Sequence, residues 1–223
     1  MLAGLEARLA GRIPGARLER VEVEGVKLHL LNGDFPRTPL PAEVARAIWD
    51  QPPYWAFCWP AGRWLARHLH LPPTRMVDLG CGSGILSIAL ALRGHTVVAV
   101  DSDPEARWAC QVNARANGVE FPILESLEQL ADPTELLVLA DFLYDPANLA
   151  DIARLESYCQ RLLLADCRLQ QAPPGYQLLA RDQGCIVPDL DWGDEFRQVM
   201  IAGCSRERAS SSRAALELRF DLP

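Results

Sequence analysis

The stretch VDLGCGSG, residues 77–84, decides the fold of this chain. It lies where an apolar strand, predicted over Met76–Leu79, ends and a helix, predicted from about Gly84 to Leu92, begins. Glycines at such a turn allow a tight bend and a close approach of the backbone to a ligand, and the N-terminus of the helix offers free N–H groups. The stretch therefore predicts a ligand-binding loop between a strand and a helix.

The spacing of these glycines separates the loop from two other glycine-rich loops. A dinucleotide-binding fingerprint, G-x-G-x-x-G, would need a third glycine at position 85, which holds Ile85. A Walker A loop needs a lysine after its last glycine, whereas Lys27 is the only lysine in the chain. The spacing disfavours a nicotinamide dehydrogenase, and the lack of lysines excludes a P-loop and nearly excludes a catalytic lysine.

An acidic residue follows the loop at the end of the second predicted strand. Asp101 comes directly after the strand predicted over Thr96–Val100. A carboxylate at this point can accept hydrogen bonds from a ribose diol. Strand, loop, helix, strand and acid in this order predict a ligand that contains a ribose.

Apolar runs and helical patterns alternate along the rest of the chain, which predicts an α/β fold with a mostly parallel sheet. The runs are almost continuously apolar, which is typical of strands covered on both faces. After residue 173 two runs follow each other without a helix, so we expect an antiparallel closing pair. The further elements predicted are helices over 104–117 and 149–158 and strands over 121–124, 136–140, 162–165, 176–179 and 198–202.

The first 74 residues differ in character and predict an N-terminal α+β cap. A helix over Leu2–Leu9 precedes a hairpin over Leu18–Leu30, and a proline-rich connection leads into the aromatic run of residues 51–69. The expected division is 1–74 for the cap and aromatic lead-in, 75–204 for the ligand-binding domain, and 205–223 for a polar C-terminal tail.

The composition narrows the classes of partner and the compartment. Acidic residues outnumber basic ones by 29 to 22, giving a formal net charge of −7, so neither nucleic acid nor an anionic membrane is an expected partner. No apolar run approaches the roughly 20 residues of a membrane span, and no signal peptide is visible. The seven cysteines are scattered without a C-x-x-C pair. These features predict reduced thiols, no metal site and a cytoplasmic location.

VDLGCGSG followed by VVAVDSDP resembles the first motif and its partner in class I, seven-stranded S-adenosylmethionine-dependent methyltransferases, over roughly residues 54–203. The resemblance implies a three-layer, Rossmann-like fold and S-adenosyl-L-methionine as the cofactor. It further implies one role for each of several residues. Gly80, Gly82 and Gly84 would pass beside the methionine part of the cofactor, Asp78 would orient the loop or reach the cofactor's amino group through water, Asp101 would bind the ribose, Ser102 would line the adenine pocket, and Glu125 or Ser126 would contact adenine N6.

A second motif, Asp141-Phe142-Leu143-Tyr144, stands at the carboxyl end of the strand predicted over 136–140. Ligands of open α/β sheets bind outside the carboxyl ends of the strands, so we expect the side chains of Asp141 and Tyr144 to reach the reacting methyl group. This D-x-x-Y pattern resembles that of protein-lysine methyltransferases within the superfamily. Small-molecule and DNA amino methyltransferases more often have (D/N)-P-P-(Y/F) here.

The run PPYWAFCWPAGRWLARHL, residues 52–69, makes the resemblance narrower. With the D-x-x-Y motif it is similar to the electron-transfer flavoprotein beta-subunit lysine methyltransferase group and its bacterial relatives. The resemblance implies that Trp59 covers the methionine part of the cofactor. We expect Trp55, Phe57 and Trp64 to pack as a hydrophobic cap on the sheet. The chain departs from the group in having CGSG for AGSG and Ser102 after the ribose acid.

The function expected is therefore N-methylation of a protein lysine, with Asp141 and Tyr144 as the catalytic residues. A lysine amine attacks only when it is neutral, so Asp141 would align it and pass its proton onward, and Tyr144 would accept an N–H or bound the pocket. A helix cap or loop ion pair is the alternative role of Asp141. Two other functions stay open: methylation of a small amine or a ribosomal protein, and a regulatory protein that binds the cofactor without catalysis.

Overall fold

A seven-stranded sheet forms the centre of the computed structural model, which describes residues 1–35, 39–144, 147–191, 193–205 and 219–220. The strand order is β6-β5-β4-β7-β8-β10-β9, in which β10 runs antiparallel to both of its neighbours, β8 and β9, and the other pairs are parallel. The predicted antiparallel closing pair is thereby confirmed. The strands are β4 (Arg75–Leu79), β5 (Thr96–Val100), β6 (Ile123–Leu124), β7 (Thr134–Ala140), β8 (Cys159–Asp166), β9 (Gln177–Gln183) and β10 (Gln198–Ser205).

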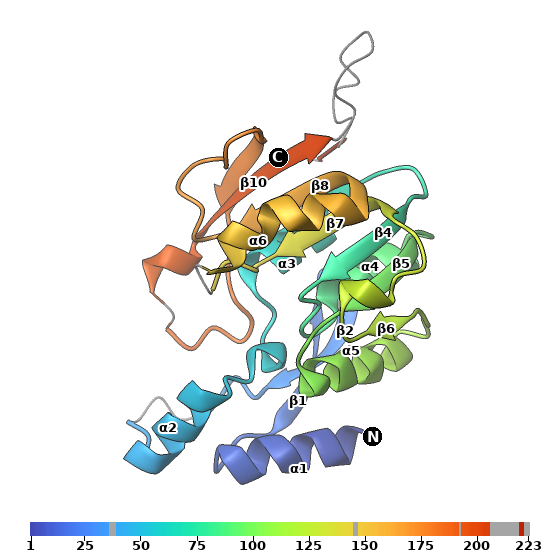
Figure 1. The fold of residues 1–223 in the computed structure, drawn as a ribbon. Helices are drawn as coiled ribbons and strands as arrows, with labels where there is room; N and C mark the ends of the chain where they lie inside the picture. The colour runs from blue at the N-terminus through green and yellow to red at the C-terminus, as the bar shows by residue number, and fades with distance from the viewer. Residues whose placement is uncertain (36–38, 145–146, 192, 206–218, 221–223) are drawn as a thin grey trace, which may run out of the picture.

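Helices cover both faces of this sheet, as Figure 1 shows. On one face α3 (Pro60–His68) and α4 (Ile85–Leu92) pack against Leu136 and Val138 of β7. On the other face α6 (Ala147–Leu155) packs against Leu137 and Leu139 of the same strand. Successive residues of a strand point to opposite faces, so burial on both sides explains the continuous apolar runs. The predicted three-layer, Rossmann-like α/β fold is confirmed.

The N-terminal segment adds α1 (Leu2–Arg12), the hairpin β1 (Leu18–Val23) and β2 (Val26–Leu31), and α2 (Ala42–Asp50). The hairpin turns at Glu24 and Gly25, both with positive φ, as the two-residue loop of a twisted hairpin requires. The helix α5 (Pro104–Ala116) packs against α1, β2 and α4, so it joins this segment to the sheet layers.

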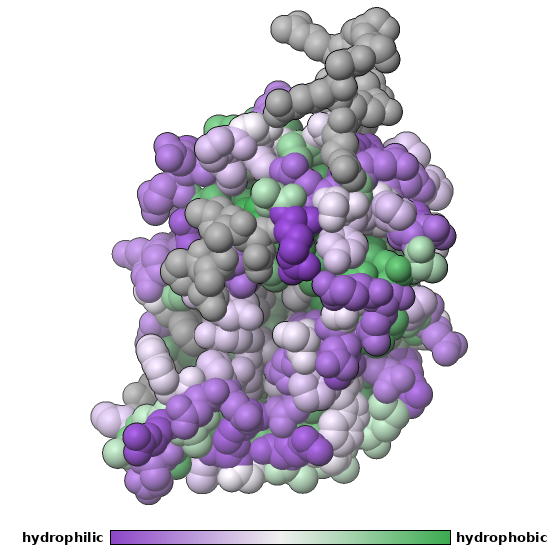
Figure 2. Space-filling model, viewed as in Figure 1, coloured by the Kyte–Doolittle hydropathy of each residue, from purple (hydrophilic) through white to green (hydrophobic). Residues whose placement is uncertain are grey.

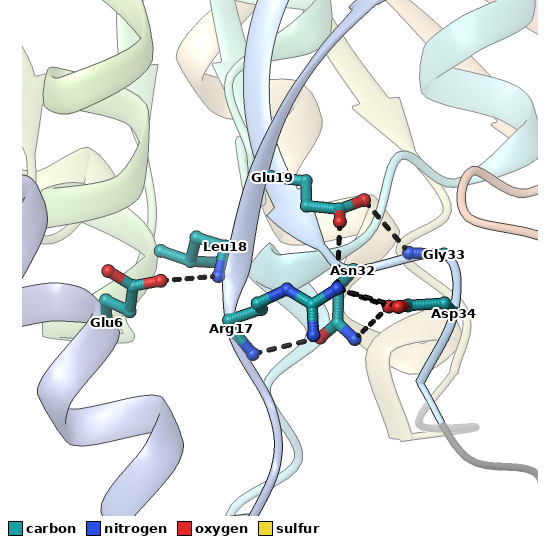
Figure 3. A network of polar contacts seen from close by, with 7 residues as sticks. All are labelled: Glu6, Arg17, Leu18, Glu19, Asn32, Gly33 and Asp34. Carbon is teal, nitrogen blue, oxygen red and sulfur yellow. Dashed lines mark hydrogen bonds and ion pairs between the residues drawn. The ribbon is translucent and has the colours of Figure 1, made fainter.

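A network of polar contacts ties the segment before β1 to the end of β2 (Figure 3). The Arg17 backbone N–H donates to Asn32 Oδ1 at 2.9 Å, and the Arg17 guanidinium pairs with Asp34 at 2.7 Å. Glu6 of α1 accepts the N–H of Leu18 at 3.0 Å. These bonds supply partners for backbone groups where the strands begin and end, and they fix α1 beside the hairpin.

Two predictions of secondary structure were wrong in extent. The predicted proline-rich connection contains α2, which follows Pro41, a residue that helix starts tolerate. The strand predicted over 121–124 keeps only Ile123 and Leu124, because Pro122 has no N–H to extend the ladder. Short elements complete the described chain: η1 (Tyr54–Ala56), η2 (Leu127–Gln129), η3 (Glu156–Tyr158), η4 (Asp194–Phe196), β3 (Leu69–His70) and β11 (Arg219–Phe220).

The structure can be compared with the predicted division into domains at two points. The helix α3, which lies before residue 75, packs against β8 and β10 of the sheet. Most of the predicted tail, residues 206–218 and 221–223, lies outside the described residues, while Arg219–Phe220 pairs with β3. The division at residues 74 and 204 stays a prediction.

The surface turned toward the viewer in Figure 2 is mostly polar, with hydrophobic side chains in small scattered areas. Within the described ranges no helix has both the length and the apolar character that crossing a bilayer requires.

Candidate active site

A cavity of about 340 Å³ opens at the carboxyl ends of β4, β5 and β7. This is the edge at which open α/β sheets bind their ligands. Nine of the ten residues proposed from the sequence line it, and Gly84 is the exception. The nine are Trp59, Asp78, Gly80, Gly82, Asp101, Ser102, Glu125, Asp141 and Tyr144.

The glycine loop is bonded directly to the end of β5. The N–H groups of Gly80 and Cys81 donate to the carbonyl oxygen of Val100, at 2.8 and 3.1 Å. The N–H of Gly82 donates to Asp101 Oδ2 at 2.9 Å. The loop and the predicted ribose acid therefore form one rigid wall of the cavity.

Gly84 lies behind this wall, where the loop meets α5. Its φ is +82°, and a Cβ atom there would lie 2.8 Å from Cys110 Sγ. The absence of a side chain lets the start of α4 pack closely on α5. The structure gives Gly84 this packing role, and its contact with a cofactor stays a prediction.

The carboxyl groups of Asp101 and Asp78 lie in the lining of the cavity. Asp101 also accepts the N–H of Asp103 at 3.0 Å, and burial raises its pKa. Asp78 accepts the N–H and the hydroxyl of Ser87, at 3.1 and 2.6 Å. Burial raises the pKa of Asp78 to about 6, against the lowering effect of these bonds from Ser87. Asp78 thus ties the end of β4 to α4, and its role in orienting the loop stays a prediction.

Arg107 of α5 links the two residues predicted for the adenine pocket. Its guanidinium donates to the carbonyl oxygens of Asp101 and Ser102, at 2.7 and 2.9 Å, and lies 3.7 Å from the Glu125 carboxylate. Ser126, the alternative to Glu125, also lines the cavity. The structure brings both candidates to the same end of the cavity, and the choice between them stays open.

Asp141 stands at the other end, and its carboxylate holds the start of α3. Oδ1 accepts the N–H of Ala61 at 3.1 Å, and Oδ2 accepts that of Gly62 at 2.8 Å. The backbone of Asp141 has a φ of +52°, which few non-glycine residues adopt. The alternative role of a helix cap is therefore realised. Burial, followed by the charge of Asp166, raises the pKa of Asp141 to about 7.

Aromatic rings form the mouth of the cavity. The rings of Tyr54 and Tyr144 lie 4.9 Å apart, and Trp59 packs edge-on to Tyr54 at 5.6 Å. The indole N–H of Trp59 donates to the carbonyl oxygen of Tyr54 at 2.8 Å. Tyr144 is 50% exposed, so it borders both the cavity and the solvent. Trp55, Phe57 and Trp64 are all buried. Trp64 packs with β7 of the sheet, as predicted, whereas Trp55 and Phe57 pack instead in a cluster with α1 and α5.

Sequence reasoning missed two charged residues of the site, Asp166 and Arg168, at the end of β8. Asp166 is fully buried and accepts the N–H groups of Leu143 and Arg168, at 2.7 and 2.8 Å. Arg168 lines the cavity, and its guanidinium lies 5.0 Å from the centre of the Phe196 ring. Part of the signal was present, because a strand was predicted over 162–165 and the carboxyl ends of parallel strands meet at one edge, but the place of β8 beside β7 was not predicted.

The described residues fit the cofactor that the resemblance implies. A Cβ atom built on Gly82 would meet only the Gly80 oxygen, at 3.9 Å, so the loop backbone is open to a ligand. Asp101 stands beside that backbone, and Trp59 lines the same cavity at the Asp141 end. A nucleoside that carries a positively charged sulfonium group suits this combination of acids and aromatic rings.

Comparisons with known proteins found methyltransferases. A family profile for ribosomal protein L11 methyltransferase (PrmA) matches residues 63–153. The electron transfer flavoprotein beta subunit lysine methyltransferase of Danio rerio is 40% identical over 114 residues, 47% of this chain and 44% of that one. The ribosomal protein L11 methyltransferase of Nitrosococcus oceani is 42% identical over 101 residues, 44% of this chain and 32% of that one.

Among solved structures, magnesium protoporphyrin IX methyltransferase from Synechocystis PCC 6803 aligns with a TM-score of 0.48 at 20% identity, covering 61% of this chain and 76% of that one. The chain spans about half the length, or less, of the curated relatives it matches. Over the matched segment, the resemblance to methyltransferases, and to the flavoprotein lysine methyltransferases in particular, is confirmed.

Proposed function

We propose that this chain is an S-adenosylmethionine-dependent N-methyltransferase that acts on a protein lysine. The observation that carries the proposal is the shared cavity, which is lined by a predicted ribose acid, Asp101, after β5 and by a predicted substrate acid, Asp141, after β7, on either side of β4. The names of the relatives support a protein substrate, since one group is named for a flavoprotein subunit and the other for a ribosomal protein. The beta subunit of electron transfer flavoprotein, or a similar protein, is the most specific candidate.

The cofactor would lie along the glycine loop. Asp101 would accept the ribose hydroxyls, Ser102 and Glu125 would border the adenine, and Trp59 would cover the methionine part. When bound, S-adenosylmethionine supplies a methyl group on a positively charged sulfur, and the C–S electron pair stays with the sulfur as the amine forms the new N–C bond.

The residues at the Asp141 end would hold the lysine amine. A carboxyl group with a pKa near 7 is about half ionised at neutral pH, and in its ionised form Asp141 can accept an N–H of the amine and take up its proton. Tyr54, Trp59 and Tyr144 would surround the aliphatic part of the side chain and exclude water. Loss of water disfavours the ammonium form and so favours the neutral amine.

The cytoplasm is the compartment that we propose for this activity. All seven cysteines are free thiols, which suits a reducing environment. Neither nucleic acid nor a membrane is part of the proposal.

Calorimetry with S-adenosylhomocysteine tests the cofactor part of the proposal. We expect binding of S-adenosylhomocysteine and no binding of NAD. Binding of NAD alone would contradict a methyltransferase. The variant Asp101→Ala serves as the matched control and should weaken the binding, because it removes the acceptor for the ribose hydroxyls.

Mass spectrometry of lysate proteins, incubated with the protein and a deuterated-methyl cofactor, tests the substrate part. We expect label on lysines of one protein, and none with Asp141→Asn. Label on a ribosomal protein or only on a small amine would favour the second function. Binding of S-adenosylhomocysteine without any labelled product would favour a regulatory protein.

A further inference from the structure

We propose that Arg168 is a positioning residue of the substrate site, whose fixed positive charge keeps the incoming lysine amine in its neutral form. The inference rests on the proposed function and deepens it. It assigns a role to a residue that no motif in the sequence marks.

The pairing of β7 with β8 brings the segment that carries Arg168 next to the loop that carries Asp141. The N–H of Asp141 donates to the carbonyl oxygen of Ala165 at 2.9 Å, and the N–H of Leu143 donates to Asp166 Oδ2 at 2.7 Å. The residues that follow β8 are thereby fixed against the residues that follow β7. Arg168 and Asp141 line the same cavity from these two neighbouring segments.

Three contacts hold the guanidinium of Arg168, one of which is a 3.9 Å contact of Nη1 with Cys167 Sγ. The guanidinium lies over the Phe196 ring, 5.0 Å from the ring centre, and its Nη1 is 3.9 Å from Asp166 Oδ1. The side chain is 32% exposed, and Asp166 is the one acid within ion-pair distance among the described residues. A planar guanidinium cannot lose its proton in proteins, so the charge stays in place at any working pH.

Two buried acids and several more exposed titratable groups surround this guanidinium. Asp141 and Asp166 face it from β7 and β8, and burial raises the pKa of both carboxyls. The charge of Arg168 acts in the opposite direction and lowers the pKa of Asp141. Burial keeps the Cys167 thiol neutral by raising its pKa to about 12. The remaining groups are the exposed acids Asp194 and Glu195 beside Phe196, the Arg154–Glu128 pair of the cavity lining, and the phenol of Tyr144.

This balance decides which form of the substrate the cavity accepts. An ammonium at Asp141 would meet the positive charge of Arg168 in a partly buried space, where repulsion is weakly screened. A neutral amine meets no such repulsion. A lysine beside another cation is a recognised way to lower an amine pKa, and here the enzyme would apply it to its substrate. Asp141 then accepts the proton that leaves the ammonium.

The pH profile of kcat measures this effect, because kcat reports ionisations of the bound complex. In Arg168→Gln we expect the rising limb of kcat to move to higher pH by about one unit, a loss of ~10-fold below the limb that is recovered above it. Arg168→Lys keeps the charge and should keep the position of the limb. Arg20→Gln, which changes an exposed arginine of β1, is the matched control and should leave the profile unchanged.

A second measurement needs neither cofactor nor turnover. The ¹³C shift of the Asp141 carboxyl, assigned with Asp141→Asn, gives its pKa in the unliganded protein. In Arg168→Gln that pKa should rise above the wild-type value, because the cation that stabilises the carboxylate is gone. It should stay near wild type in Arg168→Lys.

The outcomes separate this proposal from the proposed function. An equal loss of kcat at every pH, or a limb that does not move, would overturn the role of Arg168 even if methylation is confirmed. An unchanged Asp141 pKa would overturn it without any assay of activity. Failure of the wild-type protein to bind S-adenosylhomocysteine would instead contradict the proposed function.

Discussion

The carboxylate of Asp141 lies 2.8 Å from the backbone N–H of Gly62, a residue 79 positions earlier in the chain. The proposed substrate acid therefore also fastens the first turn of α3, which begins one residue after Trp59. Helix capping and a site role are not exclusive here, since a carboxylate has about four acceptor positions and two N–H groups occupy only two of them. The effect of each Asp141 variant on activity must therefore be compared with its effect on the free energy of unfolding.

Asp141→Asn and Asp141→Ala should have different free energies of unfolding but similar losses of turnover. Both should remove most turnover and leave S-adenosylhomocysteine binding largely intact. Asparagine keeps one oxygen acceptor, whereas alanine leaves two N–H groups without their partner, at a cost of about 2 kcal/mol. Urea unfolding beside steady-state kinetics measures both effects, and normal turnover in either variant would exclude Asp141 from catalysis.

The pH dependence of kcat/KM should show the ionisation of Asp141. Its pKa of about 7 means that the carboxylate forms as the pH rises through neutrality. Because Asp141 takes up the proton of the lysine ammonium, only Asp141 must be ionised beforehand, so the slope of log kcat/KM against pH should fall from about one to about zero near pH 7. Asp141→Asn should show a slope of about one throughout. A wild-type profile without this break would refute the assignment.

Gly84→Ala should destabilise the protein more than Gly94→Ala does. The two glycines have nearly equal φ values, +82° and +84°, so both variants suffer the same backbone strain, about 1 kcal/mol. A Cβ at position 84 also meets Cys110 Sγ at 2.8 Å, whereas nothing lies within 4 Å at position 94. We expect overpacking to add about 1–3 kcal/mol at Gly84. Equal free energies of unfolding for the two variants would show that the contact with α5 is unimportant.

Asp78 should make the protein less stable as the pH rises from about 4 to about 7. Its folded pKa of about 6 exceeds the ordinary value of 3.8, so the folded state holds a proton that the unfolded state has already released. This contribution to stability is present below the unfolded pKa and is lost as the pH rises through the folded one. Wild type should lose up to about 3 kcal/mol more than Asp78→Asn over this range. Parallel stability curves for the two proteins would contradict the raised pKa.

Local patterns were enough to predict most of the fold. The strand over Thr96–Val100 and the hairpin at Glu24–Gly25 follow from apolar runs and turn residues that act within a few positions. The helix α2 was missed because the prolines before it suggested an extended connection. Its residues Ala45, Ile48 and Trp49 do recur at helical spacing, so the signal was present in the sequence.

The site was predictable where one segment supplies both the residue and its signal. Gly80 and Gly82 come from a single motif, and Asp101 closes the strand beside it. Arg168 and Asp166 matter because β8 lies next to β7, and the order of strands in a sheet cannot be read from spacing along the chain. The hydrogen bonds between Asp141 and α3 were not predicted for a similar reason, since they join residues far apart in the sequence.

The order of the last two strands has a consequence for biosynthesis. The edge strand β9 precedes β10 in the chain, yet β10 lies between β9 and β8 in the sheet. A ribosome therefore delivers β9 before the only described strand with which it pairs. Until residues 198–205 emerge, the nascent chain carries an unpaired strand and an open β8 edge, which are the features that invite aggregation. A pause in translation before residue 205 would prolong the state in which β9 and the edge of β8 are unpaired, and a truncation there would make it permanent.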